Sequence, residues 1–113
     1  MKKRQFSVKN DFSEFPGPRF KKIGDWSGEL FRDDYLIPLI KSLDDDEILV
    51  INLDGTKGLG SSFLDESFGG AVRKGYGSYV PRLEFISTSD PSVIVEIDSY
   101  IQAELNRSQK KSK

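Results

Sequence analysis

The segment from Asn52 to Glu66 carries the residues most able to do chemistry, because an apolar stretch leads there into three spaced glycines and a pair of serines. We expect Ser61 and Ser62 to open a helix, where backbone N–H groups point outward and the helix dipole is positive. Such a corner could hold an anion or present a serine hydroxyl to a kinase. The sequence thus makes Ser61 and Ser62 a candidate phosphoacceptor or anion site.

Two other interpretations of the same corner stay open. The simpler one is helix capping, in which Ser62 accepts a hydrogen bond from the N–H of Asp65 or a neighbour and stabilises the helix by about 1 kcal/mol. The other is nucleotide binding, but a phosphate-binding P-loop requires a lysine where Ser61 stands, so nucleotide hydrolysis is the least favoured. The glycines are then best explained by a tight turn that needs positive φ.

Asp54 follows the apolar stretch and would lie at the carboxyl end of a strand, where α/β proteins place their ligands. Its carboxylate could bind Mg²⁺ or accept a phosphoryl group, with Asp11 as a second carboxylate. No lysine follows the later strand at 83–88 to complete such a site. The structural alternative is that Asp54 accepts N–H bonds from its own loop in an Asx-type turn.

Composition limits the chemistry further. The 113 residues include no cysteine and no histidine, which excludes Ser-His-Asp and Cys-His catalysis and removes the commonest metal ligand. The 17 basic and 18 acidic side chains give a net charge of −1, which argues against non-specific nucleic-acid binding. There is neither a long apolar segment nor a signal peptide. We therefore expect a cytoplasmic domain with no membrane association, no cofactor and no enzyme activity.

Hydrophobic spacing predicts strands that alternate with helices. The continuous run Ile48–Leu53 indicates a central strand covered on both faces, as in parallel sheets. Ser27 is expected to cap the first helix and Asp90, with Pro91, the last. Gly69 and Gly70 should let the second helix approach the sheet closely. The expected order is a strand at 6–8, a return strand at 19–23, a helix at 27–43 kinked at Pro38, a strand at 48–53, a helix at 62–74, a loop at 75–81, a strand at 83–88 and a helix at 90–105.

One domain is expected, at residues 6–105, between a basic tail at 1–5 and a polar basic tail at 106–113. Its fold class is α/β. The sheet is expected to be mixed, with a parallel central part, an N-terminal hairpin and three main helices.

Short motifs along the chain occur in an order and spacing that resemble a known family. They are Asp11-Phe12-Ser13, Pro16-Gly17-Pro18-Arg19, Ser27-Gly28-Glu29, Phe31-Arg32, Asn52-Leu53-Asp54-Gly55, Ser61-Ser62-Phe63-Leu64-Asp65-Glu66 and Phe68-Gly69-Gly70. With these motifs, residues 6–105 resemble the STAS domain of anti-sigma-factor antagonists. The resemblance is closer to one branch, the STAS-like domain family of uncharacterised function found in prokaryotes.

The resemblance implies a non-catalytic signalling module that binds a protein. In anti-sigma-factor antagonists that partner is a histidine-kinase-like ATPase, which phosphorylates a serine at the start of the second helix and so releases the complex. Ser61 matches this phosphoacceptor by position, and Ser62 matches the serine after it. The chain departs from the pattern at two neighbours, because Gly60 stands where aspartate is usual and Phe63 where glycine is usual.

The predicted contact surface combines the glycine-rich loop with the exposed side of the second helix. Its residues are Asp54, Gly55, Lys57, Gly58, Gly60, Glu66 and Arg73. Arg19 is expected either to bridge to an acidic residue of the second half or to bind an anionic partner. Arg32 should pair with Glu29, three residues before it, and Trp26 should fill the core beside the first helix.

Two further classes of function remain as alternatives. One is a small-ligand, nucleotide or nucleic-acid binding domain that uses Arg19, Lys57, Arg73 and Tyr76, which would have to converge on one face. The other is a metal-dependent enzyme centred on Asp54, with Lys57 beside it. The sequence also leaves a homodimer open.

Overall fold

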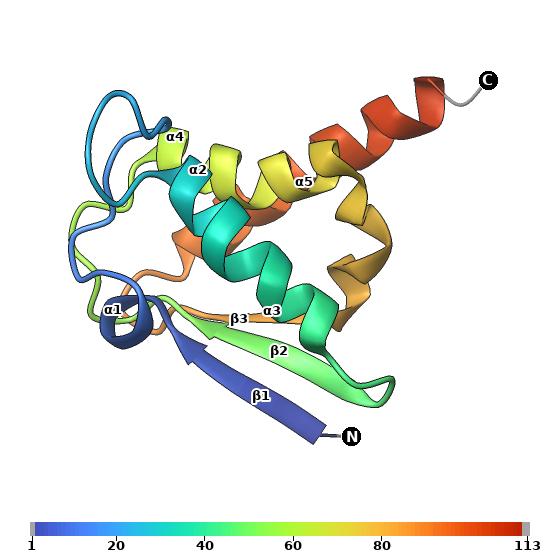
Figure 1. The fold of residues 1–113 in the computed structure, drawn as a ribbon, viewed down its shortest axis with the longest axis horizontal. Coiled ribbons are helices and arrows are strands. Elements are labelled where there is room, and N and C mark those ends of the chain that lie inside the picture. Colours follow the sequence, from blue (N-terminus) through green and yellow to red (C-terminus); the bar gives the residue numbers. More distant parts are fainter. Residues whose placement is uncertain (1, 112–113) are drawn as a thin grey trace.

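The computed structural model describes residues 2–111, with side chains up to residue 109, and shows three strands beside a layer of helices (Figure 1). The strands are β1 (Lys2–Ser7), β2 (Glu47–Asn52) and β3 (Leu83–Ile86), all parallel and in the order β1-β2-β3. The expected α/β class and the central place of the apolar strand are therefore confirmed.

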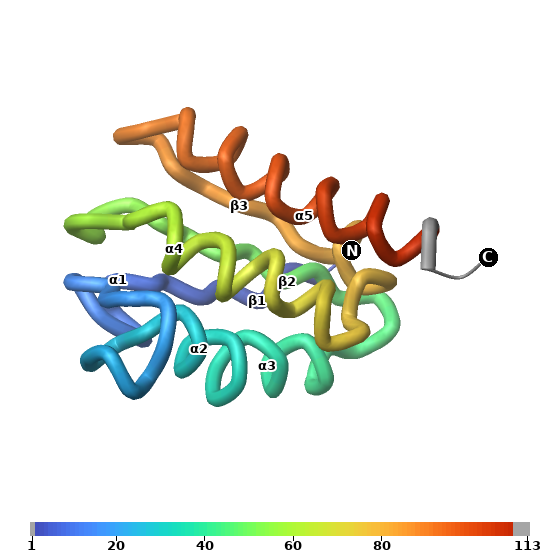
Figure 2. The backbone as a smooth tube through the Cα atoms, turned by 90° about the horizontal axis from the view of Figure 1, so that it is seen from above, coloured from blue at the N-terminus to red at the C-terminus, as the bar shows by residue number. Residues whose placement is uncertain are grey.

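Three helical segments start at the same end of the sheet and run across it (Figure 2). The first consists of α2 (Gly28–Phe31), a π-helical turn (Arg32–Leu36) and α3 (Ile37–Ser42); the second of α4 (Ser61–Leu64) and the π-helical turns Asp65–Gly69 and Val72–Tyr76; the third is α5 (Ser92–Lys111). A short helix α1 (Val8–Asp11) follows β1, and a 3₁₀ segment (Gly77–Arg82) precedes β3. Within residues 2–111, no helix is long and apolar enough to cross a membrane.

The first and last helices start as the local sequence predicts. The hydroxyl of Ser27 accepts a hydrogen bond from the N–H of Leu30 at 3.0 Å, which confirms Ser27 as the cap of the first helix. The Asp90 carboxylate accepts from the N–H of Ser92 at 3.2 Å, at the start of α5. The distortion expected at Pro38 takes the form of the wider turn just before it, where the N–H of Ile37 donates to the Arg32 carbonyl.

The helices lie on one side of the sheet (Figure 1), although the middle of β2 is buried on both faces, as expected. Val50 is only 1% exposed. Its neighbours in register are Gln5 and Glu84, and the Lys3–Glu84 ion pair at 3.3 Å joins the two outer strands across β2. Polar residues of the two outer strands thus flank Val50 on the face without helices.

Two other expectations about the ends of the chain are also wrong. Residues 19–23 form no strand and β1 pairs in parallel with β2, so there is no N-terminal hairpin. The reason is that the carbonyls of Pro18 and Arg19 accept from the N–H groups of Gly28 and Glu29, which uses this backbone to hold the start of α2.

The presumed tails belong to the fold, because residues 2–5 lie in β1 and residues 106–111 in α5; Met1, Ser112 and Lys113 lie outside the described residues.

Candidate functional site

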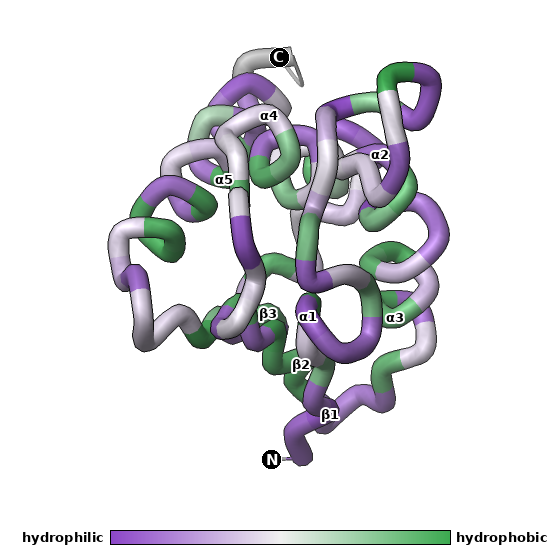
Figure 3. The backbone as a smooth tube through the Cα atoms, turned by 90° about the vertical axis from the view of Figure 1, so that its left-hand side faces the viewer, coloured by the Kyte–Doolittle hydropathy of each residue, from purple (hydrophilic) through white to green (hydrophobic). Residues whose placement is uncertain are grey.

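The carboxyl ends of the strands and the amino ends of α2, α4 and α5 meet at one end of the molecule, which Figure 3 views directly. We call this end the rim and define it by the connections 12–27, 53–60 and 87–91. The first two connections run side by side (Figure 3), and the N–H of Lys57 donates to the Glu14 carbonyl at 2.8 Å. A backbone hydrogen bond therefore links the first two loops of the rim.

Ser61 and Ser62 are both exposed at the rim, but neither caps the helix. Gly60 is the N-cap residue, and its carbonyl accepts from the N–H of Leu64 at 3.1 Å. The capping role expected for Ser62 is wrong, because both serines already lie inside the first helical turn and their side chains project outward from it.

The Ser61 hydroxyl instead reaches α5. It donates to a carboxylate oxygen of Glu96 at 2.6 Å, and the Tyr100 hydroxyl donates to the same oxygen at 2.5 Å. The hydrogen bond to Glu96 also raises the pKa of Tyr100 above its ordinary value. Sequence reasoning missed Glu96 and Tyr100, although their i, i+4 spacing on a predicted helix placed them on one face.

The glycine-rich loop is shaped by backbone conformation. Gly55 and Gly58 have φ of 86° and 77°, which confirms the expected need for positive φ. Lys57 is engaged at the loop, in an ion pair with Glu14 at 3.5 Å and 5.7 Å from the centre of the Phe15 ring. Its charge is thus used to hold two rim connections together.

Asp54 joins the ends of β2 and β3. Its carboxylate accepts hydrogen bonds from the hydroxyl and N–H of Thr88 at 2.7 and 2.8 Å and from the N–H and hydroxyl of Ser89 at 3.1 and 3.2 Å. The Asx-type turn expected of Asp54 belongs to Asn52, whose side chain accepts from the N–H of Asp54 at 2.9 Å. Among the described residues, no group of three His, Cys, Asp or Glu side chains is arranged to hold a metal ion.

These hydrogen bonds, the one from the Thr88 hydroxyl first, lower the pKa of Asp54. Because the pKa is lower in the folded protein, Asp54 stabilises the fold above the unfolded pKa of about 4, and this contribution disappears as pH falls through the folded pKa. Asp54→Asn should therefore lower Tm at neutral pH, and its difference from the native protein should shrink as the pH is lowered into that range. Asp45→Asn, at an exposed turn carboxylate, is the control. A difference that stays constant with pH would contradict this role.

The charged residues on the helices and on the connection before α2 form an ion-pair network within the domain. Glu66 pairs with Arg32, with Arg19 at 3.2 Å and with Arg73 at 3.6 Å. Asp65 binds Arg19 at 2.7 Å and Arg73 at 3.4 Å. Burial raises the pKa of Asp65, but the hydrogen bond from Arg19 and the charge of Arg73 outweigh it, so the net pKa is lowered. The expected bridge from Arg19 to an acidic residue of the second half is confirmed.

This network changes the predicted contact surface. Glu66 is 8% exposed, so it is not a surface contact, whereas Arg73 stays exposed while it pairs with Glu104 at 2.6 Å. Arg32 pairs with Asp33 and Glu66, not with the expected Glu29. Asp54, Gly55, Lys57, Gly58 and Gly60 remain at the rim beside Ser61 and Ser62.

Gly69 and Gly70 make room for the network, not for the sheet. A Cβ atom at Gly69 would lie 2.7 Å from a carboxylate oxygen of Asp65, and one at Gly70 would lie 3.0 Å from a guanidinium nitrogen of Arg32. The expected close approach to the sheet is therefore wrong, since these glycines face the arginine side chains.

The four residues of the nucleic-acid alternative do not converge. Arg19 and Arg73 meet at Asp65, while Lys57 pairs with Glu14. Tyr76 packs near Tyr79, with their ring centres 6.1 Å apart, in the segment that leads into the amino end of β3.

Trp26 does not fill the core, because it is 42% exposed; its ring lies nearly perpendicular to that of Phe12, with 5.4 Å between ring centres. The same connection also exposes Phe15 and Ile23. Sequence reasoning missed these two as surface residues, although apolar residues set among Pro16, Gly17 and Gly24 were a usable signal.

Comparison with known families agrees with this architecture. A family model described as a STAS-like domain of unknown function matches residues 27–93, from the cap of α2 to the first turn of α5. Comparisons with curated proteins and with solved structures find no significant match. The matched segment is more than half of the chain and contains two of the three strands, the glycine-rich loop and the serine pair. The chain belongs to the family of STAS-like domains of unknown function.

Proposed function

We propose that this domain is a non-catalytic regulatory module of the prokaryotic cytoplasm that docks on a protein partner at the rim, and that Ser61 controls the docking. The partner proposed is a histidine-kinase-like ATPase that phosphorylates Ser61 or Ser62. The observation that carries the proposal is the exposed Ser61 hydroxyl, which sits at the first position of a rim helix and is held by Glu96 at 2.6 Å.

A phosphate on Ser61 would act directly on this contact. It would replace the hydroxyl proton that Ser61 donates and place nearly two negative charges against the carboxylate of Glu96. Asp65, one turn further along the same helix, is already paired with Arg19 and Arg73, so no free cation of that network is available to the phosphate. The modification would thus push α4 and α5 apart at the rim and add charge to the docking surface.

The rest of the charged residues support a binding role. Arg19 before α2, Arg32 on the first helix and Arg73 on the second are all engaged in ion pairs within the domain. Asp54 is saturated by four donors from Thr88 and Ser89. The rim therefore offers hydroxyls, backbone and apolar groups to a partner more than it offers acid–base groups to a substrate.

Ser61→Asp should abolish partner capture, whereas Ser61→Ala should retain it, because only aspartate brings negative charge against Glu96. The measurement is a pull-down from the native cytoplasm with each protein, followed by intact mass and peptide mapping. Ser78→Asp, an exposed serine in the 3₁₀ segment, adds the same charge away from the rim and is the matched control.

The native protein and Ser61→Ala should capture the same ATPase, and the native protein should gain a phosphate on Ser61 or Ser62. Equal capture by Ser61→Asp and by the native protein, with no modification of either serine, would refute the switch.

A further inference from the structure

Building on the proposed function, we propose that the connection 12–27 is the primary docking surface and that it binds a segment of the partner protein in which an apolar side chain is flanked by carboxylates. This connection lies almost entirely before the segment that the family model matches, which begins at Ser27. This inference rests on the proposed function and names the part of the rim that binds the partner; Ser61 is not part of that contact.

Exposed apolar side chains are concentrated on this connection. Phe15 is 60% exposed, Ile23 64% and Trp26 42%, and of the large hydrophobic side chains exposed in the described part of the chain the only other one is Val95, on α5. Apolar side chains gathered on one exposed segment mark a contact site more often than single scattered ones do. Aromatic residues are also the side chains that most often dominate the energy of an interface.

The connection is held rigidly, which lowers the entropic cost of binding. The N–H of Gly17 donates to the Trp26 carbonyl at 2.8 Å and closes the segment at its base. Any larger residue at Gly17 would overlap the Asp25 carbonyl. Arg19 fastens the middle of the connection to Asp65.

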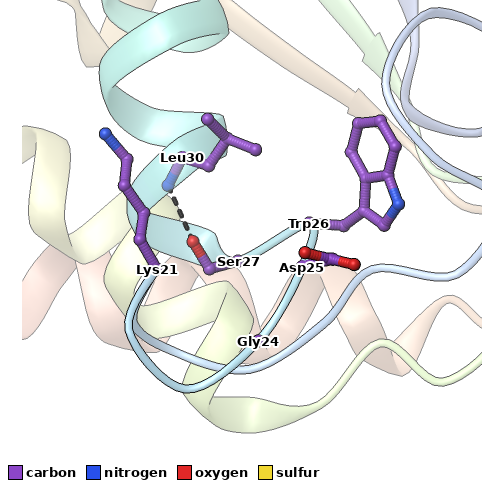
Figure 4. A pocket seen from close by; sticks show the side chains of 6 residues that line it. All are labelled: Lys21, Gly24, Asp25, Trp26, Ser27 and Leu30. Atoms are coloured by element: carbon purple, nitrogen blue, oxygen red, sulfur yellow. Dashed lines mark hydrogen bonds between the residues drawn. The ribbon is translucent and has the colours of Figure 1, made fainter.

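Trp26 is held in an unusual backbone conformation for so large a side chain. Its φ of 57° is in the left-handed region, and it is the only described residue other than glycine with positive φ. Such strain costs of order 1 kcal/mol or more and is concentrated at functional sites. Here it keeps the indole at the surface beside a hollow of about 410 Å³. Figure 4 shows Trp26 and Lys21 on opposite sides of this hollow.

Charge selects the chemistry of the occupant. Lys21 and Lys22 are exposed beside Ile23, and Lys21 lines both the hollow at Trp26 and a second one of about 370 Å³ beside Phe20. Of the nearby acidic residues, Glu14 is paired with Lys57, and Glu29, which also lines the second hollow, accepts from the N–H of Lys21, which leaves Asp25 as the exposed carboxylate on the connection. Two exposed ammonium groups next to apolar anchors fit a peptide whose carboxylates flank an aliphatic or aromatic residue.

The test selects binders to the full chain from random peptides displayed on phage and measures the selected peptides by fluorescence anisotropy. We expect the enriched peptides to combine an aromatic or aliphatic residue with neighbouring Asp or Glu. Ile23→Ser and Phe15→Ser should each weaken binding by about tenfold or more, because they remove exposed anchors without touching the core. Val95→Ser removes a comparably exposed apolar side chain from α5 and should leave binding unchanged.

Lys21→Glu should also weaken binding, and added salt should reduce the affinity of the native protein toward that of the variant. No enrichment, enrichment of peptides without acidic residues, or equal binding by Ile23→Ser would each overturn the proposal. Binding of phosphatidylglycerol vesicles through Ile23 would overturn it in favour of a membrane surface. A dimer in sedimentation velocity that Ile23→Ser abolishes would overturn it in favour of a second copy.

The same variants separate this proposal from the proposed function. If Ile23→Ser loses the peptides and also the captured ATPase while Ser61→Asp keeps both, the docking surface is right and the Ser61 switch is wrong. If Ser61→Asp loses the ATPase while Ile23→Ser keeps both the ATPase and the peptides, the switch stands and the docking surface is wrong.

Discussion

Replacing Glu66 with leucine should lower the free energy of unfolding by about 3 to 5 kcal/mol, because it removes the buried carboxylate that partners the buried guanidinium of Arg32. Arg32 is only 5% exposed and would retain Asp33 alone. Arg19 and Arg73 would then share Asp65. Urea unfolding of the native protein and the variant measures the difference directly.

The matched control is Glu84→Gln, which breaks the Lys3–Glu84 pair on the open face of the sheet. Both of these side chains are about half exposed, so the loss should be at most about 1 kcal/mol. The double variant Arg32→Met/Glu66→Leu should recover part of the stability lost in Glu66→Leu, because removing both charges of a buried pair costs less than removing one. Equal losses for Glu66→Leu and Glu84→Gln would show that Glu66 does not hold the helices together.

Phe31→Ala should destabilise the domain by about 3 to 5 kcal/mol, since it empties the centre of the aromatic core. Phe31 is fully buried, and its ring centre lies 5.1 Å from that of Phe12, 5.7 Å from Phe68, 5.8 Å from Phe63 and 6.0 Å from Phe6. These rings come from β1, the connection 12–27 and the second helix, so one cavity weakens every layer that positions the rim. Thermal and urea unfolding would both report the loss.

Phe15→Ala removes the same number of atoms from a ring that is 60% exposed and should change stability by no more than about 0.5 kcal/mol. The two substitutions should therefore have different effects: Phe31→Ala should lower stability, and Phe15→Ala should weaken peptide binding. A destabilisation by Phe15→Ala as large as that by Phe31→Ala would contradict the exposed position of Phe15 and its proposed role in docking.

Sequence patterns predicted the features that depend on interactions between residues close together in the chain. Apolar spacing predicted the helices and the central strand β2, and side-chain oxygens at Ser27 and Asp90 marked two helix starts. The positive φ at Gly55 and Gly58 also followed from composition, because glycine adopts that conformation without a steric cost. These features depend on residues only a few positions apart.

The pairing of β1 depended on a distant part of the chain and could not be obtained this way. The charges of Lys2, Lys3 and Arg4 predict a basic tail at residues 1–5. In the fold, Lys2 pairs with Asp44 and Arg4 with Glu47, so the acidic turn before β2 neutralises the basic start of β1. The register of β1 is set by its backbone pairing with β2, which buries Phe6 in the core, and a pattern within one segment cannot reveal that pairing.

The site shows the same division between local and tertiary information. The sequence by itself determined that a strand, a glycine-rich loop and an exposed serine pair follow one another, because this order is encoded in adjacent residues. Only the tertiary structure decided that Ser61 meets Glu96, that Glu66 is buried among three arginines, and that Phe15, Ile23 and Trp26 stay at the surface. Each of these outcomes depends on which helices pack together, because packing sets the burial of a side chain and the charges that it meets.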